Sequence, residues 1–143
     1  LKYYKKKFKR IKFYELMVSD TFGVHDYRKK IIYTLRTNYH KKETTTIASK
    51  NLYINLLNVI DIINAIKIIL RRNITPKKYL LINSTYTKIF HLVKTFNNQN
   101  KKKLKIKWLS NRLIKDKIYP YDKLKGWKPK NSYVRDIIDY IKN

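Results

Sequence analysis

The spacing of apolar residues along the chain alternates between two periods, and each period predicts one kind of secondary structure. Apolar residues three and four positions apart predict amphipathic helices, whereas short continuous or alternating apolar runs predict strands. The helical spacing occurs in residues 1–12, 26–39, 58–73, 86–96 and 132–141. The strand pattern occurs in residues 13–18, 51–57, 79–83 and 104–109. Helices and strands therefore alternate along the chain, which predicts an α/β domain.

The ends and faces of these helices follow from individual residues. Leu1, Tyr4 and Phe8 share one face of the opening segment, as expected for the end of a helix. Three side chains are predicted to cap the helices that follow them, namely Asp26, Asn58 and Thr85. The strongest helix, 58–73, is expected to bury a stripe made of Val59, Ile62, Ile63, Ile66 and Ile69.

Three polar segments separate the periodic ones. Residues 40–50 indicate a loop or an edge hairpin, and residues 97–103 a solvated linker. Residues 110–131 form a long stretch that contains proline and has no clear period, so we expect it to be irregular. Ser132 is then expected to cap the last helix.

Charge is the strongest compositional signal. The 143 residues include 35 Lys and Arg against 9 Asp and Glu, for a formal net charge of +26. One interpretation is a surface that binds nucleic acid or another polyanion. The other is that the composition follows from AT-rich coding. Lysines occur in every segment and outnumber arginines, whereas a protein that reads phosphates would favour arginine. Composition alone does not separate these interpretations.

Composition also excludes several classes of protein. The chain has no cysteine and only three scattered histidines, so we expect neither disulfides nor a metal site. Its apolar runs are too short to cross a bilayer and its opening is not a signal peptide, so we expect a cytoplasmic protein without a membrane partner. A hydrophobic content of 43% is enough to build a packed core.

Candidate chemistry begins at residues 19–23, directly after a predicted strand. Ser19, Asp20 and Thr21 would lie at the carboxyl end of that strand, where open α/β sheets bind ligands. The same residue types also form loops held by local hydrogen bonds, and the isolated segment favours this alternative. Asp61, on the apolar helix, is expected to be an exposed acid that favours the helix dipole.

Residues 126–130 favour a structural role. Gly126 would form a turn, Trp127 would fill a gap and Pro129 would fix the chain. We find no Gly-rich phosphate loop and no nucleophile paired with a base, so we expect no catalytic residues in this chain.

Four segments, in chain order, together resemble the extended short-chain dehydrogenase/reductases, also called the NAD-dependent epimerase/dehydratase family. They read ELMVSDTFGVHDYRKKII, LLNVIDIINAIKIIL, YLLINSTYTKIFHLVKTF and KLKGWKPKNSYVRDIIDYI. The first segment is similar to the family's S-N-x-Y-G strand and loop, and the second to its V-D-D-V segment. The third is similar to its y-N-i-g segment, and the last to its L-G-W-x-P signature. The variant S-D-T-F-G resembles the branch that acts on CDP-deoxyhexoses.

The resemblance implies a fold, a cofactor and a substrate. Residues 1–143 would be a single truncated unit: the C-terminal part of a Rossmann-type doubly wound sheet plus the small substrate-binding domain. The parent enzyme would be an NAD(P)-dependent epimerase, dehydratase or reductase that binds a nucleotide-diphosphate sugar and forms a homodimer. Its NAD or NADP would be bound mainly by an N-terminal half, which would also supply a Gly-rich loop and a catalytic Tyr-x-x-x-Lys pair upstream of Leu1. The fragment alone would be inactive.

The resemblance also assigns roles to residues of this chain. Six would face substrate or cofactor, namely Ser19, Asp20, Thr21, Phe22, Arg28 and Arg112. Five would be structural, namely Gly23, Asp61, Gly126, Trp127 and Pro129. Under this resemblance we do not expect the chain to bind nucleic acid. The alternative hypothesis is that it is a small basic RNA-binding protein of the ribosomal type.

Overall fold

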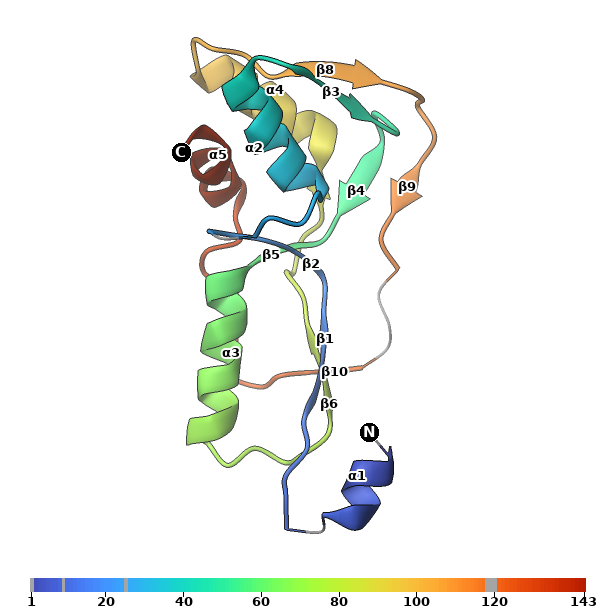
Figure 1. Ribbon diagram of the computed structural model, residues 1–143, viewed down its shortest axis with the longest axis vertical. Coiled ribbons are helices and arrows are strands. Elements are labelled where there is room, and N and C mark those ends of the chain that lie inside the picture. The colour runs from blue at the N-terminus through green and yellow to red at the C-terminus, as the bar shows by residue number, and fades with distance from the viewer. Residues whose placement is uncertain (1, 9, 25, 118–120) are drawn as a thin grey trace.

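The computed structural model describes residues 2–8, 10–24, 26–117 and 121–143, which form a mixed α/β fold with mainly parallel strand pairs. One part is built on a sheet in which β6 (Lys78–Leu81) lies between β1 (Glu15–Val18) and β10 (Asp122–Lys123). Both neighbours run parallel to β6, and Glu15 pairs with Lys78. Helix α3 (Val59–Arg71) lies along this part of the molecule (Figure 1).

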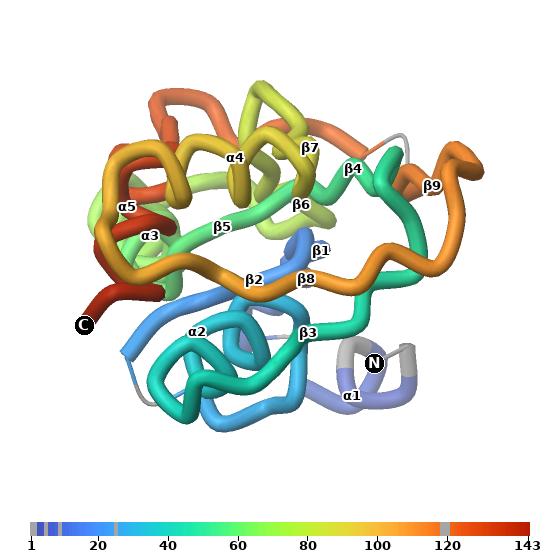
Figure 2. The backbone as a smooth tube through the Cα atoms, turned by 90° about the horizontal axis from the view of Figure 1, so that it is seen from above, coloured from blue at the N-terminus to red at the C-terminus, as the bar shows by residue number. Residues whose placement is uncertain are grey.

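The second part contains shorter strand pairs and three helices. Strand β2 (Asp20–Phe22) pairs with β5 (Leu56–Asn58), and β3 (Thr44–Ile47) pairs with β8 (Lys105–Trp108), in both cases parallel. Strand β4 (Leu52–Ile54) lies between β7 (Thr87–Lys88) and β9 (Ile114–Lys115). The helices are α2 (Ile31–Lys41), α4 (Ile89–Gln99) and α5 (Val134–Lys142). Figure 2 shows β3 and β8 side by side in the view from above.

Two hydrophobic clusters correspond to these two parts. The larger cluster packs α2, α4 and α5 together, around fully buried residues such as Leu35, Phe96 and Ile137. The smaller cluster joins α3 to β6 through Ala65 and Tyr79. The chain passes from the first part to the second at Ser19, between β1 and β2 (Figure 1).

The predicted order of the main helices and strands is confirmed, with several differences. Residues 20–22, expected in a loop, form β2, and residues 87–88, expected in a helix, form β7. Residues 44–47 form β3 rather than a loop or hairpin, because Thr45 and Ile47 alternate inward and are each 2% exposed. The predicted strand 51–57 is divided at Asn55 into β4 and β5. The stretch 110–131 contains the short strands β9 and β10.

The predicted caps are partly wrong. Asn58 caps α3, since its side chain accepts a hydrogen bond from the Ile60 amide. Asp26 does not cap α2, which begins after Lys30, and Thr85 does not cap α4, which begins after Lys88. Ser132 is not the cap of α5 either; Tyr133 occupies that position in a capping box with Asp136.

Two further expectations concern exposed surfaces. The predicted stripe of α3 is wrong in part, because Ile63 and Ile66 are 45% and 41% exposed while Ala65 is fully buried. Helix α1 (Lys2–Lys7) ends before Phe8, whose ring stacks on that of Tyr4. Leu1, the remaining residue of the predicted face, lies outside the described residues.

Among the helices that the structure describes, none is long and apolar enough to cross a membrane.

Candidate functional site

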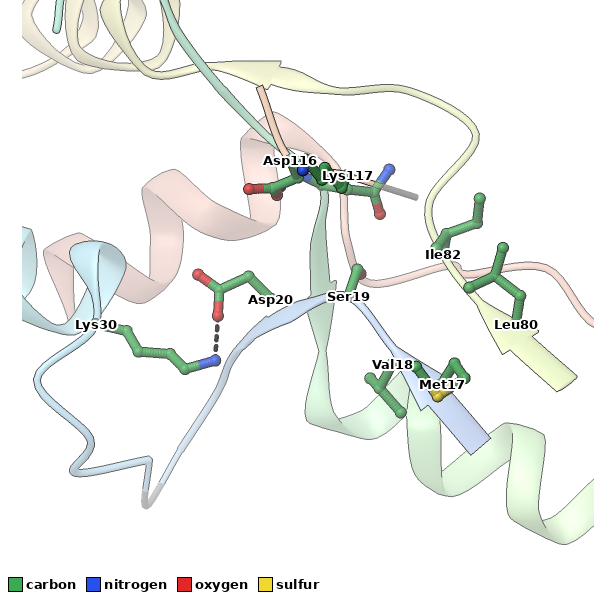
Figure 3. Close-up of a pocket in the computed structure, with 10 residues that line it drawn as sticks. Met17, Val18, Ser19, Asp20, Lys30, Leu80, Ile82, Asp116 and Lys117 are labelled. Atoms are coloured by element: carbon green, nitrogen blue, oxygen red, sulfur yellow. Dashed lines mark hydrogen bonds and ion pairs between the residues drawn. The ribbon is translucent and has the colours of Figure 1, made fainter. Parts of the chain in front are cut away.

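A pocket of about 300 Å³ opens where β1 and β6 end (Figure 3). Because the two strands are parallel, their carboxyl ends meet at one edge of the sheet, which is where open α/β sheets bind ligands. One wall is apolar and consists of Met17, Val18, Leu80 and Ile82. The rest is polar and consists of Ser19, Asp20, Lys30, Asn55, Asp116 and Lys117.

Ser19 lines this pocket directly after β1. Its amide donates to the carbonyl of Leu81 at 3.2 Å, which extends the pairing of β1 with β6 by one residue. Its hydroxyl oxygen is buried and has no hydrogen-bond partner among the described residues. A buried hydroxyl normally has a partner, because desolvation without one is costly. Ser19 therefore carries an unsatisfied hydroxyl in the wall of the pocket.

Asp20 and Lys30 form an ion pair on the side of the pocket away from Leu80 and Ile82 (Figure 3). Asp20 also accepts a hydrogen bond from the Thr21 amide at 3.1 Å. The side chains of Asp20 and Lys30 are 25% and 35% exposed, so water or a ligand can reach the pair. A phosphate entering here would compete with Asp20 for the Lys30 ammonium group.

Asp116 and Lys117 complete the pocket from the segment after β9. The carboxylate of Asp116 accepts from the Asn55 amide at 2.8 Å through Oδ2. Its Oδ1 accepts no hydrogen bond within the described part of the chain. Lys117 forms no ion pair there either, so this pocket holds one paired and one unpaired lysine. Neither residue could be predicted from the sequence, because the segment shows no period and no motif.

A buried hydrogen-bond network connects this pocket to the C-terminal segment. Asn55, which interrupts the strand run, is fully buried and exchanges two hydrogen bonds with the backbone of Asn83, of 2.9 and 2.8 Å. The Asn83 side chain donates to the carbonyl of Ser132 at 2.8 Å. The Ser132 hydroxyl then accepts from the Asn58 amide and donates to Asp61. The sequence shows that Asn55 is a polar residue inside an apolar run, but it does not show which residues Asn55 contacts.

Asp61 is the last member of this network. It is 1% exposed, so the expectation of an exposed acid is wrong. Its carboxylate accepts from the amides of Lys130 and Asn131, each at 2.9 Å, from the Asn131 side chain at 3.0 Å and from the Ser132 hydroxyl at 2.5 Å. These donors provide the partners that a buried carboxylate requires. Asp61 therefore fixes the segment that leads into α5.

The remaining structural residues fit this arrangement. The Trp127 indole donates to the carbonyl of Asp61 at 2.9 Å and packs against the smaller cluster. Gly126 has φ +75, and a side chain there would come within 2.6 Å of the Arg72 guanidinium. At Gly23, an added Cβ would meet the Val59 side chain at 3.2 Å. Pro129 accepts a hydrogen bond from the Tyr133 hydroxyl at 3.4 Å.

The other predicted ligand-facing residues lie outside the pocket. Phe22 is 1% exposed and packs edge-on against Tyr140 in the core. Thr21 is 9% exposed, and its hydroxyl accepts from Arg28. Arg112 is exposed on the segment before β9 and does not line the pocket. Of the six predicted residues, the structure therefore brings only Ser19 and Asp20 into the pocket.

Arg28 forms an ion pair with Asp26 beside this site. Its Nε and Nη2 donate to the two carboxylate oxygens of Asp26, each at 2.6 Å. Hydrogen bonding to Arg28 lowers the pKa of Asp26 below its usual 3.8 and raises the pKa of Arg28. The pair fixes the loop between β2 and α2, and Asp26 lies four residues before the N-cap position of the helix, which Lys30 occupies.

This lowered pKa predicts a pH effect on stability. Because the pKa of Asp26 is lower in the folded than in the unfolded chain, the pair stabilises the fold above pH 3.8 and loses its contribution as the pH falls through the folded value. We expect Asp26→Asn to cost less than about 1 kcal/mol at pH 7, since Arg28 is largely exposed. The cost should vanish towards pH 2 in urea unfolding, and a cost that grows on acidification would contradict the pairing.

Comparisons with known proteins show that this fold is shared with nucleotide-sugar enzymes. No family model matches the chain, and no curated protein matches it in sequence. The structure is similar to dTDP-glucose 4,6-dehydratase from Bacillus anthracis in complex with NAD, with a TM-score of 0.71 and 16% identity over 98% of this chain and 46% of that chain. It is also similar to UDP-glucose 4-epimerase from Thermus thermophilus in complex with NAD, with a TM-score of 0.76 and 14% identity over 99% and 50%.

A third solved structure, UDP-glucuronic acid 4-epimerase from Bacillus cereus in complex with UDP-glucuronic acid and NAD, has a TM-score of 0.76 and 15% identity over 99% of this chain and 48% of that chain. The present chain thus spans about half the length of the solved structures it matches. At these identities the likeness establishes the fold: the chain corresponds to part of a Rossmann-type epimerase/dehydratase structure.

Proposed function

We propose that the pocket at the ends of β1 and β6 binds a nucleotide-diphosphate sugar, and that the chain is the substrate-binding C-terminal portion of an NAD(P)-dependent epimerase, dehydratase or reductase. The observation that carries the proposal is the buried hydroxyl of Ser19, which has no partner among the described residues and lines this pocket. Similar solved structures hold UDP-glucuronic acid and NAD, which supports the class of ligand.

The residues of the pocket suit such a ligand chemically. Lys30 and Lys117 can neutralise a diphosphate. The Ser19 hydroxyl and the free Oδ1 of Asp116 can hydrogen-bond to sugar hydroxyls, while Met17, Leu80 and Ile82 provide an apolar wall for the sugar ring. A pocket of about 300 Å³ accommodates the sugar and part of the diphosphate rather than the whole nucleotide.

We expect this chain to lack a complete nicotinamide cofactor site. The sequence has two glycines, Gly23 and Gly126, and neither belongs to a Gly-rich phosphate loop. We therefore propose that NAD or NADP is bound mainly by another part of the parent protein, and that residues 1–143 alone are inactive. The homodimer, the cytoplasmic location and the CDP-deoxyhexose branch remain predictions from the sequence.

The proposal predicts weaker sugar-nucleotide binding when the unpaired lysine is removed. We expect Lys117→Gln to weaken the binding of UDP-glucose by about tenfold, since one charge-assisted hydrogen bond to phosphate is lost. Isothermal titration calorimetry of the chain with UDP-glucose measures this change.

The matched control removes an equal charge from an exposed lysine of β8, by Lys105→Gln, and should leave the affinity unchanged. Ser19→Ala should weaken binding as well, with little effect on stability, because its hydroxyl has no partner in the described part of the chain. Equal affinities for all three variants would reject the proposed site.

A further inference from the structure

Asn83 is a buried polar residue next to the wall of the pocket. It follows Ile82, which belongs to the apolar wall, but it is not itself among the described residues that line the pocket. It is 3% exposed. Its side chain donates to the Ser132 carbonyl at 2.8 Å and accepts from the Thr85 amide at 3.4 Å. The first of these contacts joins the end of β6 to the segment that leads into α5.

The backbone of Asn83 holds a residue that does line the pocket. The Asn55 side chain donates to the Asn83 carbonyl at 2.9 Å and accepts from the Asn83 amide at 2.8 Å. The backbone amide of Asn55 donates in turn to Oδ2 of Asp116 at 2.8 Å. A continuous series of hydrogen bonds therefore leads from the Ser132 carbonyl to the Asp116 carboxylate.

The far end of this series is anchored. The Ser132 hydroxyl accepts from the Asn58 amide at 2.8 Å and donates to the Asp61 carboxylate at 2.5 Å. The Ser132 carbonyl therefore has a defined position, to which the Asn83 side chain can fix the end of β6.

These contacts lie inside the chain. Asn55, Asn83 and Ser132 are 0%, 3% and 1% exposed, so the contacts do not depend on what covers the surface of the chain. A buried hydrogen bond is electrostatically stronger than one in water, and its loss leaves a partner that solvent does not readily satisfy. We therefore expect a change at Asn83 to be transmitted to Asn55.

We propose that Asn83 is a positioning residue for the pocket. By fixing the end of β6 to the Ser132 carbonyl, its side chain sets the place of Asn55. The Asn55 amide then sets the orientation of the Asp116 carboxylate, so this edge is already ordered when a ligand arrives and the entropic cost of binding is lower. The effect on affinity rests on the proposed function, because the pocket must bind a nucleotide sugar to report on Asn83.

Calorimetric titration with UDP-glucose tests the effect on binding. Asn83→Ser keeps a hydroxyl that can still accept from the Thr85 amide, but its side chain is too short to retain the contact with the Ser132 carbonyl. We expect this variant, and also Asn83→Ala, to weaken UDP-glucose binding by about fivefold. Both variants leave unchanged every described side chain that lines the pocket.

The matched control is Thr45→Ala, which removes a buried hydroxyl from β3. Thr45 is 2% exposed, accepts from the Asn38 side chain at 3.1 Å and is not among the described residues of the pocket. Its replacement should lower the midpoint of urea unfolding, as the Asn83 variants do. The affinity for UDP-glucose should change by less than about twofold.

A second measurement needs no ligand. In NMR spectra of the free chain, the Asn83 variants should move the Asn55 amide proton upfield and shift the carboxyl carbon of Asp116, because the hydrogen bond between these groups lengthens. Thr45→Ala should leave both signals in place.

A conservative variant should restore the signals and the affinity. In Asn83→Asp at about pH 5, burial keeps the introduced carboxyl neutral, so that its hydroxyl can donate to the Ser132 carbonyl. Both signals and the affinity should then match those of the unsubstituted chain at the same pH.

Two results would overturn the proposal. One is lowered stability of Asn83→Ser with unchanged affinity and unchanged Asn55 and Asp116 signals, because Asn83 would then only stabilise the fold. The other is an equal loss of affinity in Thr45→Ala, because general destabilisation would then account for the effect. If the unsubstituted chain does not bind UDP-glucose, the proposed function fails, and the Asp116 signal alone decides whether Asn83 positions this carboxylate.

Discussion

Replacing Asp61 with alanine is expected to lower the free energy of unfolding by about 3 to 5 kcal/mol. The substitution leaves the amides of Lys130 and Asn131 and the hydroxyl of Ser132 without their acceptor. Each buried donor left unpaired costs about 1 to 3 kcal/mol, and water entering the site offsets part of the sum. Urea unfolding followed by circular dichroism measures the loss.

The matched control is Asp139→Ala, which removes an exposed acid from α5. We expect this variant to change stability by less than about 0.5 kcal/mol. A loss below about 1 kcal/mol for Asp61→Ala would show that the segment at residues 126–132 is not held by this carboxylate.

Replacing Asn55 with alanine is expected to have the next largest effect, about 2 to 4 kcal/mol. Asn55 is fully buried, and its side chain satisfies both the amide and the carbonyl of Asn83. Because Asn55 also lines the pocket, we expect the same variant to weaken UDP-glucose binding. Unfolding in urea and calorimetric titration together measure the two effects.

The control for this change is Asn98→Ala, at an exposed position in α4. It should alter neither stability nor binding beyond about 0.5 kcal/mol. If Asn55→Ala destabilised the chain but bound UDP-glucose with unchanged affinity, the network would be structural only and would not position the pocket.

The order of elements could be predicted because each depends on local periodicity. The strand β3 was missed since one of its two inward residues is a threonine. The Thr45 hydroxyl accepts a hydrogen bond from Asn38 at 3.1 Å, a contact that the pattern of apolar residues does not reveal. The exposed side of α3 was missed for the opposite reason. Its aliphatic residues are distributed around the whole helix, so periodicity could not identify the face that packs on β6.

Only part of the site could be predicted from the sequence. Ser19 and Asp20 follow a strand, and the carboxyl-end rule therefore located them. Asp116 and Lys117 come from a segment without a motif, and only the folded chain brings them to the same edge. Asp61 was assigned to the surface because its partners follow it by about 70 residues, a separation at which sequence patterns carry no signal.

The central claim is that the edge formed by β1, β6 and residues 116–117 binds a nucleotide sugar. The most direct measurement is a titration of the isotopically labelled chain with UDP-glucose, followed by amide chemical shifts. We predict saturable shifts confined to the pocket residues, above all Ser19, Asp20, Asn55, Asp116 and Lys117. Shifts spread over lysines throughout the surface, reproduced by an RNA oligonucleotide and removed by salt, would contradict the claim and favour a polyanion-binding protein.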